Sequence, residues 1–198
     1  MATYHAIAAT SLAILGLLKD ACPKDEFQNA GFALYHPGDF ETPSMDEGIS
    51  LLLYRVVPNG SLRNLQPRLS PDGRKYRASL PLDLHYVLTA WARSVEKQQR
   101  LLGWSMRVLE DTPILPAGLL NHFMPESETF HGNETVELIC ETLSIQDWTA
   151  LWDKMKPKIQ TSVTYVARMV VIESNVEIAS AEMVQTREFV YGRMPKSS

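Results

Sequence analysis

The stretch Leu82–Pro116, LDLHYVLTAWARSVEKQQRLLGWSMRVLEDTPILP, decides the fold, because a strand pattern changes within it into a helix pattern. In its first part the side chains point alternately to two faces, and both faces carry apolar groups. One face carries Leu82, Leu84, Tyr86, Leu88 and Ala90, and the other carries Asp83, His85, Val87, Thr89 and Trp91. This distribution predicts a central strand that is covered on both sides.

The second part of the stretch has the spacing of an amphipathic helix. Its predicted apolar stripe consists of Leu102, Met106 and Leu109, widened by Leu101 and Val108. The helix ends at 111–113, because a proline restricts the residue before it and cannot continue the helical hydrogen bonding. The segment is therefore expected to have one buried and one solvated face.

Regular patterns recur along the rest of the chain. They predict helices over 3–21, 117–121 and 145–155, and strands over 31–36, 48–57, 135–143 and 160–173. The first helix, capped by Thr3, has an apolar face so wide that we expect burial in the core and against a neighbouring subunit. In the last strand, alternation assigns Ala167, Met169 and Val171 to one face.

The composition is that of an ordinary globular protein. Of the 198 residues, 45% are hydrophobic and 21% are charged, which suits one domain with a sizeable core. The net charge of −4 gives no reason to expect nucleic-acid binding. Two cysteines, Cys22 and Cys140, are too few for a disulfide framework, so we expect buried thiols in a reducing compartment.

Domain limits and membrane signals follow from the ends of the chain. Residues 1–175 are predicted to form a single α/β domain, and residues 176–198 a C-terminal arm or tail. The first eighteen residues lack charges, but they also lack the positive start of a signal peptide. Polar residues interrupt this run, so it predicts a soluble helix and no membrane span.

Positive charge concentrates between residues 59 and 80, in a segment read as irregular and as the clearest candidate binding region. It carries Arg63, Arg68, Arg74, Lys75 and Arg77. Two interpretations stay open, a solvated loop or a docking surface for an acidic partner. Residues 183–191 are a second candidate, as a strand or extended arm that adds to a neighbouring sheet, with Arg187, Phe189 and Tyr191 as contacts.

Few residues have the spacing of catalytic or metal sites. Asp83 and His85 share a strand face, and a carboxylate can orient an imidazole for acid–base catalysis. Glu137 and Glu141 are read as solvent or interface charges. The residues Glu128, His122 and His131 have no spacing typical of a tight metal site. Phosphate-binding glycine loops and nucleophile motifs are absent from the sequence, so we expect no cofactor, no metal and no enzymatic activity.

The order of these elements resembles the tail-terminator or cap proteins of contractile injection systems, which are phage-tail-like particles. The resemblance is carried by LHYVLTAWA followed by EKQQRLLGWSMRVLEDTPIL, by GISLLLYRV, and by ETVELICETLSIQDWTALWDKMKPKIQTSVTYVARMVVI. It covers roughly residues 4 to 173 and depends on the succession of elements rather than on one short motif. It offers no residue-level motif for partner contacts.

The resemblance implies both a fold and a role. The implied fold is α+β, a mixed and largely antiparallel β-sheet flanked by helices. The implied role is a structural cap, a homo-hexameric ring that closes the end of the inner tube and engages the last sheath layer. Inner tube and sheath proteins would be its partners, and assembly in the cytoplasm would make it part of an injection particle. Two alternatives remain, a small enzyme using Asp83 and His85, or a monomeric adaptor protein.

Overall fold

The computed structural model describes residues 2–42, 45–62, 65–70, 72–124, 129–155 and 160–178. Its helices are α1 (Ala6–Ala21), α2 (Val95–Asp111), α3 (Ala117–His122) and α4 (Ile145–Met155), with 3-10 turns η1 (Pro37–Phe40) and η2 (Gly60–Leu62). Its strands are β1 (Gly31–Leu34), β2 (Gly48–Pro58), β3 (Arg68–Leu69), β4 (Lys75–Tyr76), β5 (Leu80–Trp91), β6 (Ile114–Pro116), β7 (Thr135–Glu141) and β8 (Ser162–Ile172).

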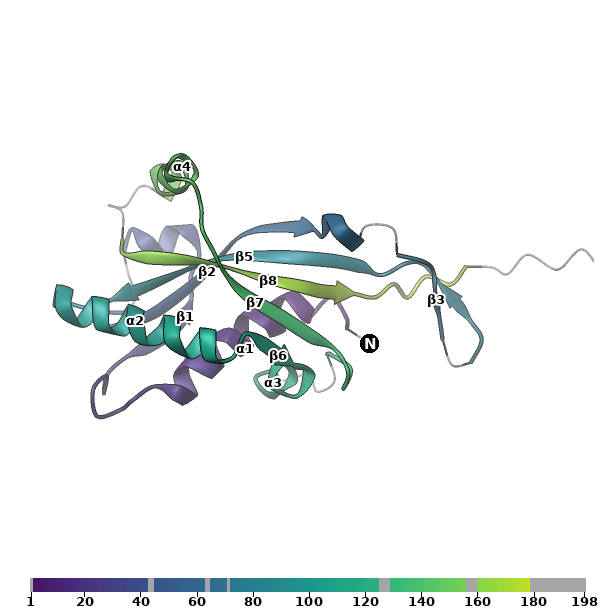
Figure 1. Cartoon of the computed structure of the whole chain (residues 1–198), viewed down its shortest axis with the longest axis horizontal. Coiled ribbons are helices and arrows are strands. Elements are labelled where there is room, and N and C mark those ends of the chain that lie inside the picture. Colours follow the sequence, from purple (N-terminus) through teal and green to yellow (C-terminus); the bar gives the residue numbers. More distant parts are fainter. Residues whose placement is uncertain are drawn as a thin grey trace, which may run out of the picture.

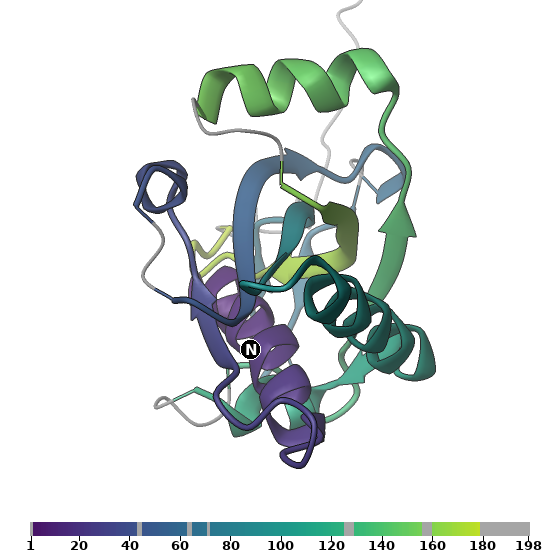
Figure 2. The same ribbon diagram turned by 90° about the vertical axis from the view of Figure 1, so that its left-hand side faces the viewer.

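One six-stranded sheet organises the molecule, in the order β1-β2-β5-β8-β7-β6, and β3 and β4 form a separate pair. Only the β1–β2 pairing is parallel among the described strands, so the sheet is mixed and largely antiparallel, as predicted. Helices α1, α2 and α3 lie against one face of the sheet, and α4 and η1 lie over the other (Figures 1 and 2). The α+β prediction is confirmed.

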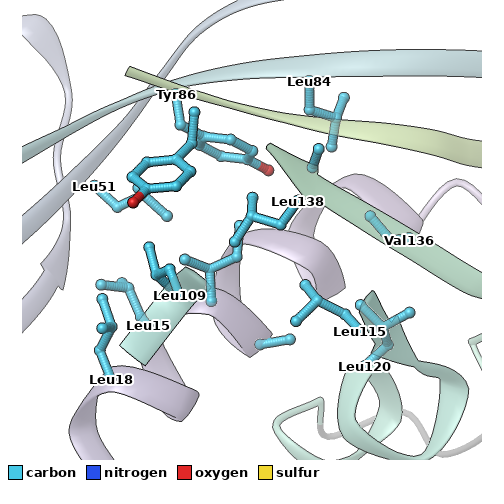
Figure 3. Packing of buried hydrophobic residues seen from close by; sticks show 14 of the residues in the cluster. Leu15, Leu18, Leu51, Leu84, Tyr86, Leu109, Leu115, Leu120, Val136 and Leu138 are labelled. Carbon is cyan, nitrogen blue, oxygen red and sulfur yellow. The ribbon is translucent and has the colours of Figure 1, made fainter. Parts of the chain in front are cut away.

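Strand β5 is buried on both faces, as its sequence predicts. The larger hydrophobic cluster includes Leu84, Tyr86 and Leu88 of β5. Figure 3 shows Leu15 and Leu18 of α1 on the same side of the sheet as Tyr86. On the opposite face, a smaller and more aromatic cluster combines Tyr35, Phe40, Leu52, Val87, Trp91 and Trp152. The strand therefore ties two separate cores together.

All four predicted helices are present, and each ends close to the predicted residue. Two details need correction. Helix α1 begins at Ala6 rather than at residue 3, and the N-cap residue is His5, which makes no side-chain cap. Thr3 accepts hydrogen bonds from His5 and Ala6 in the turn that precedes the helix. In α2 the fully buried line is Leu101, Ser105 and Leu109, not the line through Leu102 and Met106.

A buried serine explains the second correction. The Ser105 hydroxyl donates to the carbonyl of Leu101 at 2.7 Å, so its polar group is satisfied within the helix itself. A serine that bonds its own helix can lie at a core position, because burial of a polar group is costly only without a partner. The apolar pattern alone does not reveal this.

The alternation predicted for β8 is wrong beyond Ala167, because a bulge interrupts the strand. Leu84 of β5 pairs with Ala167, and Leu82 pairs with Val170, so β8 contains one extra residue in this interval. Met169 adopts φ +68°, a left-handed conformation that occurs at bulges and favours glycine. Val170 therefore joins Ala167 in the larger cluster, and Met169 is left 39% exposed.

A buried polar contact between α1 and β5 predicts an asymmetric mutational response. The hydroxyls of Ser11 and Tyr86 lie 2.9 Å apart in the core, and Ser11 also donates to the Ile7 carbonyl at 3.1 Å. We expect Ser11→Ala to lower the free energy of unfolding by about 1–3 kcal/mol, since it leaves the Tyr86 hydroxyl unpaired. Tyr86→Phe should cost less, because Ser11 keeps its helix bond. Urea denaturation measures both changes.

The control is Ser105→Ala, which removes a buried hydroxyl that bonds only its own helix. We expect it to change the free energy of unfolding by less than either core variant. A larger loss for Tyr86→Phe than for Ser11→Ala would contradict this assignment of donors and acceptors.

Candidate assembly surfaces

Part of the positively charged segment forms a two-stranded hairpin rather than an irregular loop. Strands β3 and β4 pair as a hairpin, and Gly73 adopts φ +84° in its turn. Residues 176–178 lie antiparallel beside β4, because Tyr76 bridges to Glu177 and the Ile178 amide donates to the Lys75 carbonyl at 2.8 Å. We call β3, β4 and residues 174–178 the finger. It projects from one end of the main sheet, beyond the helices (Figure 1).

Arg68 anchors the finger to the body of the protein. Its Nε lies 3.2 Å from Oε2 of Glu173, and its guanidinium lies 4.7 Å from the centre of the Tyr76 ring. Both charged side chains are largely buried, at 20% and 13% exposed. Attraction between these charges, together with the cation–π contact, holds β3 against the chain that leaves β8. Arg68 thus has a structural partner within its own chain.

The other cations of the finger are exposed. Arg74 pairs with Asp72, Nε to Oδ2 at 2.6 Å, and hydrogen bonds from Arg74 keep the pKa of the Asp72 carboxyl below its usual value. Lys75 and Arg77 are exposed, and within the described part of the chain neither forms a salt bridge. Arg63, Arg187, Phe189 and Tyr191 lie outside the described residues. The predicted contacts of all these residues stay predictions.

Apolar side chains accompany these charges. Leu69 is 65% exposed and Val176 is 51% exposed, and Leu80 at the base of the finger is 48% exposed. Exposed apolar side chains gathered on one element, with arginine beside them, favour a surface that a partner covers. The finger is therefore the candidate surface that the sequence and the structure both indicate.

The geometry does not form the dyad that an enzyme using Asp83 and His85 requires. Asp83 accepts two hydrogen bonds from the Asn59 amide, at 2.9 and 3.1 Å. His85 instead places Nδ1 at 2.8 Å from Oε2 of Glu141, across β8. The four hollows described on this surface are lined by neither Asp83 nor His85.

Glu141 lies in a polar cluster on the smaller core face. The Tyr54 and His85 rings are 6.0 Å apart, and burial together with the negative charge of Glu141 raises the pKa of Tyr54 to about 12. Tyr54 is the extra residue of a second bulge, which lies in β2 opposite Tyr86 and His85. No sequence feature marks this bulge, and Glu141, expected to be a solvent or interface charge, instead contacts His85.

The structure describes only some of the residues behind the predictions about metal binding, thiols, membrane crossing and domain limits. Among the described residues no group of His, Cys, Asp and Glu side chains is arranged to hold a metal ion, and Glu128 lies outside these residues. Cys22 and Cys140 are free, and burial raises the pKa of each thiol. Within the same described ranges, no helix combines the length and apolar character that a membrane crossing requires. The domain boundary predicted after residue 175 stays a prediction.

Comparisons with known proteins give a consistent result. The family model of the Pvc16 N-terminal domain matches residues 9–186. The PVC sheath/tube terminator of an extracellular contractile injection system, in its extended state, has a similar structure, with a TM-score of 0.63 and 14% identity. That similarity covers 97% of this chain and 65% of the terminator.

A second solved structure shares the fold less closely. The tube-terminating cap of the anti-feeding prophage has a TM-score of 0.51 and 12% identity, over 86% of this chain and 60% of the cap. None of the curated proteins matches the sequence significantly. The chain therefore has the terminator-like fold that was predicted, and it spans less than two thirds of the length of these two proteins.

The anchoring role of Arg68 can be tested directly. We expect Arg68→Ala to lower hydrogen-exchange protection of the Arg77 and Ile178 amides at least about tenfold, because Glu173 loses the partner of a largely buried charge. The matched control is Arg74→Ala, which breaks an exposed ion pair and should leave protection of both amides unchanged. Equal effects of the two variants would show that the Arg68 contact does not hold the finger.

Proposed function

The chain belongs to the Pvc16 N-terminal domain family, and on this premise we propose that it is the structural cap of a contractile injection system. The cap closes the end of the inner tube and engages the last sheath layer. The observation that carries the proposal is the family match over residues 9–186, joined to a fold shared with two proteins described as terminating a tube.

The outline of the sheet is compatible with this role. A tube extends because each layer presents surface and strand edges that template the next layer, so a cap must offer no equivalent template on its outer side. Edge strand β6 has three residues; Pro113 directly precedes it, and Pro116 is its last residue. Prolines cannot donate to a sheet ladder, so this edge is a poor template for a further strand.

Six copies close into a ring through head-to-tail contacts, and the ring acts as one part of an injection particle. Its role is non-enzymatic, which fits the separation of Asp83 from His85 by their different partners. The monomeric adaptor differs in one respect that can be measured, because it would leave the particle end open.

Contacts with the tube or sheath are assigned to the finger. Arg74, Lys75 and Arg77 present positive charge there, and Leu69 presents apolar area. Arg68 is not included among these contacts, since its guanidinium already contacts the Glu173 carboxylate and the Tyr76 ring. A surface of this kind suits an acidic partner with an apolar centre.

The direct test is electron microscopy of particles made with and without this chain. We expect tubes of uncontrolled length, or particles with bare ends, when the chain is missing, because nothing then blocks addition of further tube rings. Particles of normal length with closed ends in its absence would contradict the proposal.

A charge reversal tests the finger separately. The double change Lys75→Glu and Arg77→Glu should leave the fold intact, as both side chains are exposed, and should reproduce the open ends. Its control is Arg93→Glu, an exposed arginine in the loop between β5 and α2. Normal particles from the finger variant would remove the finger from the contact surface while leaving the capping role in place.

A further inference from the structure

Strand β1 presents an unpaired backbone edge. The amide of Gly31 donates to the Glu47 carbonyl at 2.9 Å, and the amide of Tyr35 donates to the Leu51 carbonyl at 3.0 Å. Alternate residues of a strand direct their backbone groups to opposite sides, so those of Phe32 and Leu34 point away from β2. Within the described ranges no other strand lies on that side of β1.

An apolar groove runs beside this edge. It has a volume of about 410 Å³ and lies between α1, β1 and the residue that follows α3. Its walls include Leu12, Leu15, Lys19, Phe32, Leu34 and Phe123. Leu34 is 44% exposed, and Lys19, in the last turn of α1, is the charged residue among the lining side chains. A free strand edge next to an apolar groove is the arrangement that accepts an added strand.

One segment of the chain has the side-chain pattern that this site requires. In 183–191, MVQTREFVY, alternate positions Val184, Thr186, Glu188 and Val190 share one face of an extended strand. That face carries three β-branched side chains, two of them apolar valines, and one carboxylate. If it lies over the groove, Val184 and Val190 meet apolar walls and Glu188 faces the Lys19 ammonium.

The number of residues between Ile178 and the segment limits which copy can supply it. Leu34 pairs with Leu51, which in turn pairs with Leu88, so this end of β1 lies at the level of Leu88 in β5. Ile178 is bonded to Lys75, which lies beyond Leu80 at the opposite end of β5. Leu80 and Leu88 are separated by about 26 Å along the strand. The six steps from residue 178 to residue 184 span at most about 22 Å. Residue 184 therefore cannot lie beside Leu34 of its own chain.

We propose that residues 184–190 of one copy add a strand to the β1 edge of the next copy. The inference rests on the proposed function, because a closed ring requires each copy to meet its neighbour head to tail. The finger, which precedes the donor segment in the sequence, lies at one end of the sheet, and β1 lies toward the other end (Figure 1). Such an exchange links every copy to the next without using the same surface twice.

The test uses full-length chains within assembled particles. Leu34 is replaced by a photoreactive benzoylphenylalanine, in particles that contain an equal mixture of ¹⁵N-labelled and unlabelled copies of the chain. After irradiation, mass spectrometry identifies the joined peptides. We expect adducts between position 34 and residues 183–191, with labelled and unlabelled peptides joined to one another, which requires two copies.

The matched control carries the same photoreactive residue at Ile114 of β6, which is exposed and lies at the other edge of the sheet. It should give no adduct with 183–191. Adducts of position 34 with the tube protein, with the sheath protein or only within one copy would overturn the proposal, as would the absence of any adduct with this segment.

Exchanging the two charges provides an independent test. Lys19→Glu and Glu188→Lys should each lower the adduct yield about five-fold, since each replaces an attractive pair with a repulsive one. The double variant should restore the yield. Lys24→Glu, at another exposed lysine near the end of α1, should have no effect. A double variant as defective as either single one would count against pairing of these two residues.

Failure of this inference can be told apart from failure of the capping role. If the chain is found at the particle end but position 34 joins other peptides, strand exchange is wrong and capping stands. If particle ends close without the chain, while purified copies still give the 34-to-183–191 adduct, capping is wrong and strand exchange stands.

Discussion

Burial of β5 on both faces is the constraint on which the rest of the structure depends. Tyr86 and Leu88 face the cluster formed with α1, α2 and α3, and Val87 and Trp91 face the aromatic cluster under α4 and η1. Each fully buried large apolar side chain contributes about 1.5–3 kcal/mol. Since both cores share this one strand, its register fixes the positions of β2, β8 and every element that pairs with them.

The sequence predicts those elements whose apolar pattern is regular. The sequence predicts both faces of β5, the C-terminal end of α2 and the short helix α3 correctly, because period-two and helical spacing leave few other interpretations. Bulges were not predicted, because they insert one residue without a distinctive signal. Met169 shows the difficulty, as methionine takes a left-handed position where glycine is the usual residue. Every side chain beyond it changes face.

The sequence predicts that the candidate surface is positively charged, but it does not predict that this surface is a hairpin. Five cations between residues 59 and 80 marked the region, but nothing in the sequence paired Arg68 with Glu173, more than 100 positions away. Long-range contacts of this kind depend on the register of β5 and β8, which places the finger at the end of the sheet. The same register keeps the finger away from β1, so the molecule has distinct ends and suits head-to-tail assembly.

The most direct test is a cryo-EM reconstruction of the particle end at a resolution that distinguishes side chains. We expect a closed ring of this chain as the terminal layer, with the finger against tube or sheath and each copy joined to its neighbour at the β1 edge. A terminal layer without this chain, or this chain at another level of the particle, would contradict it.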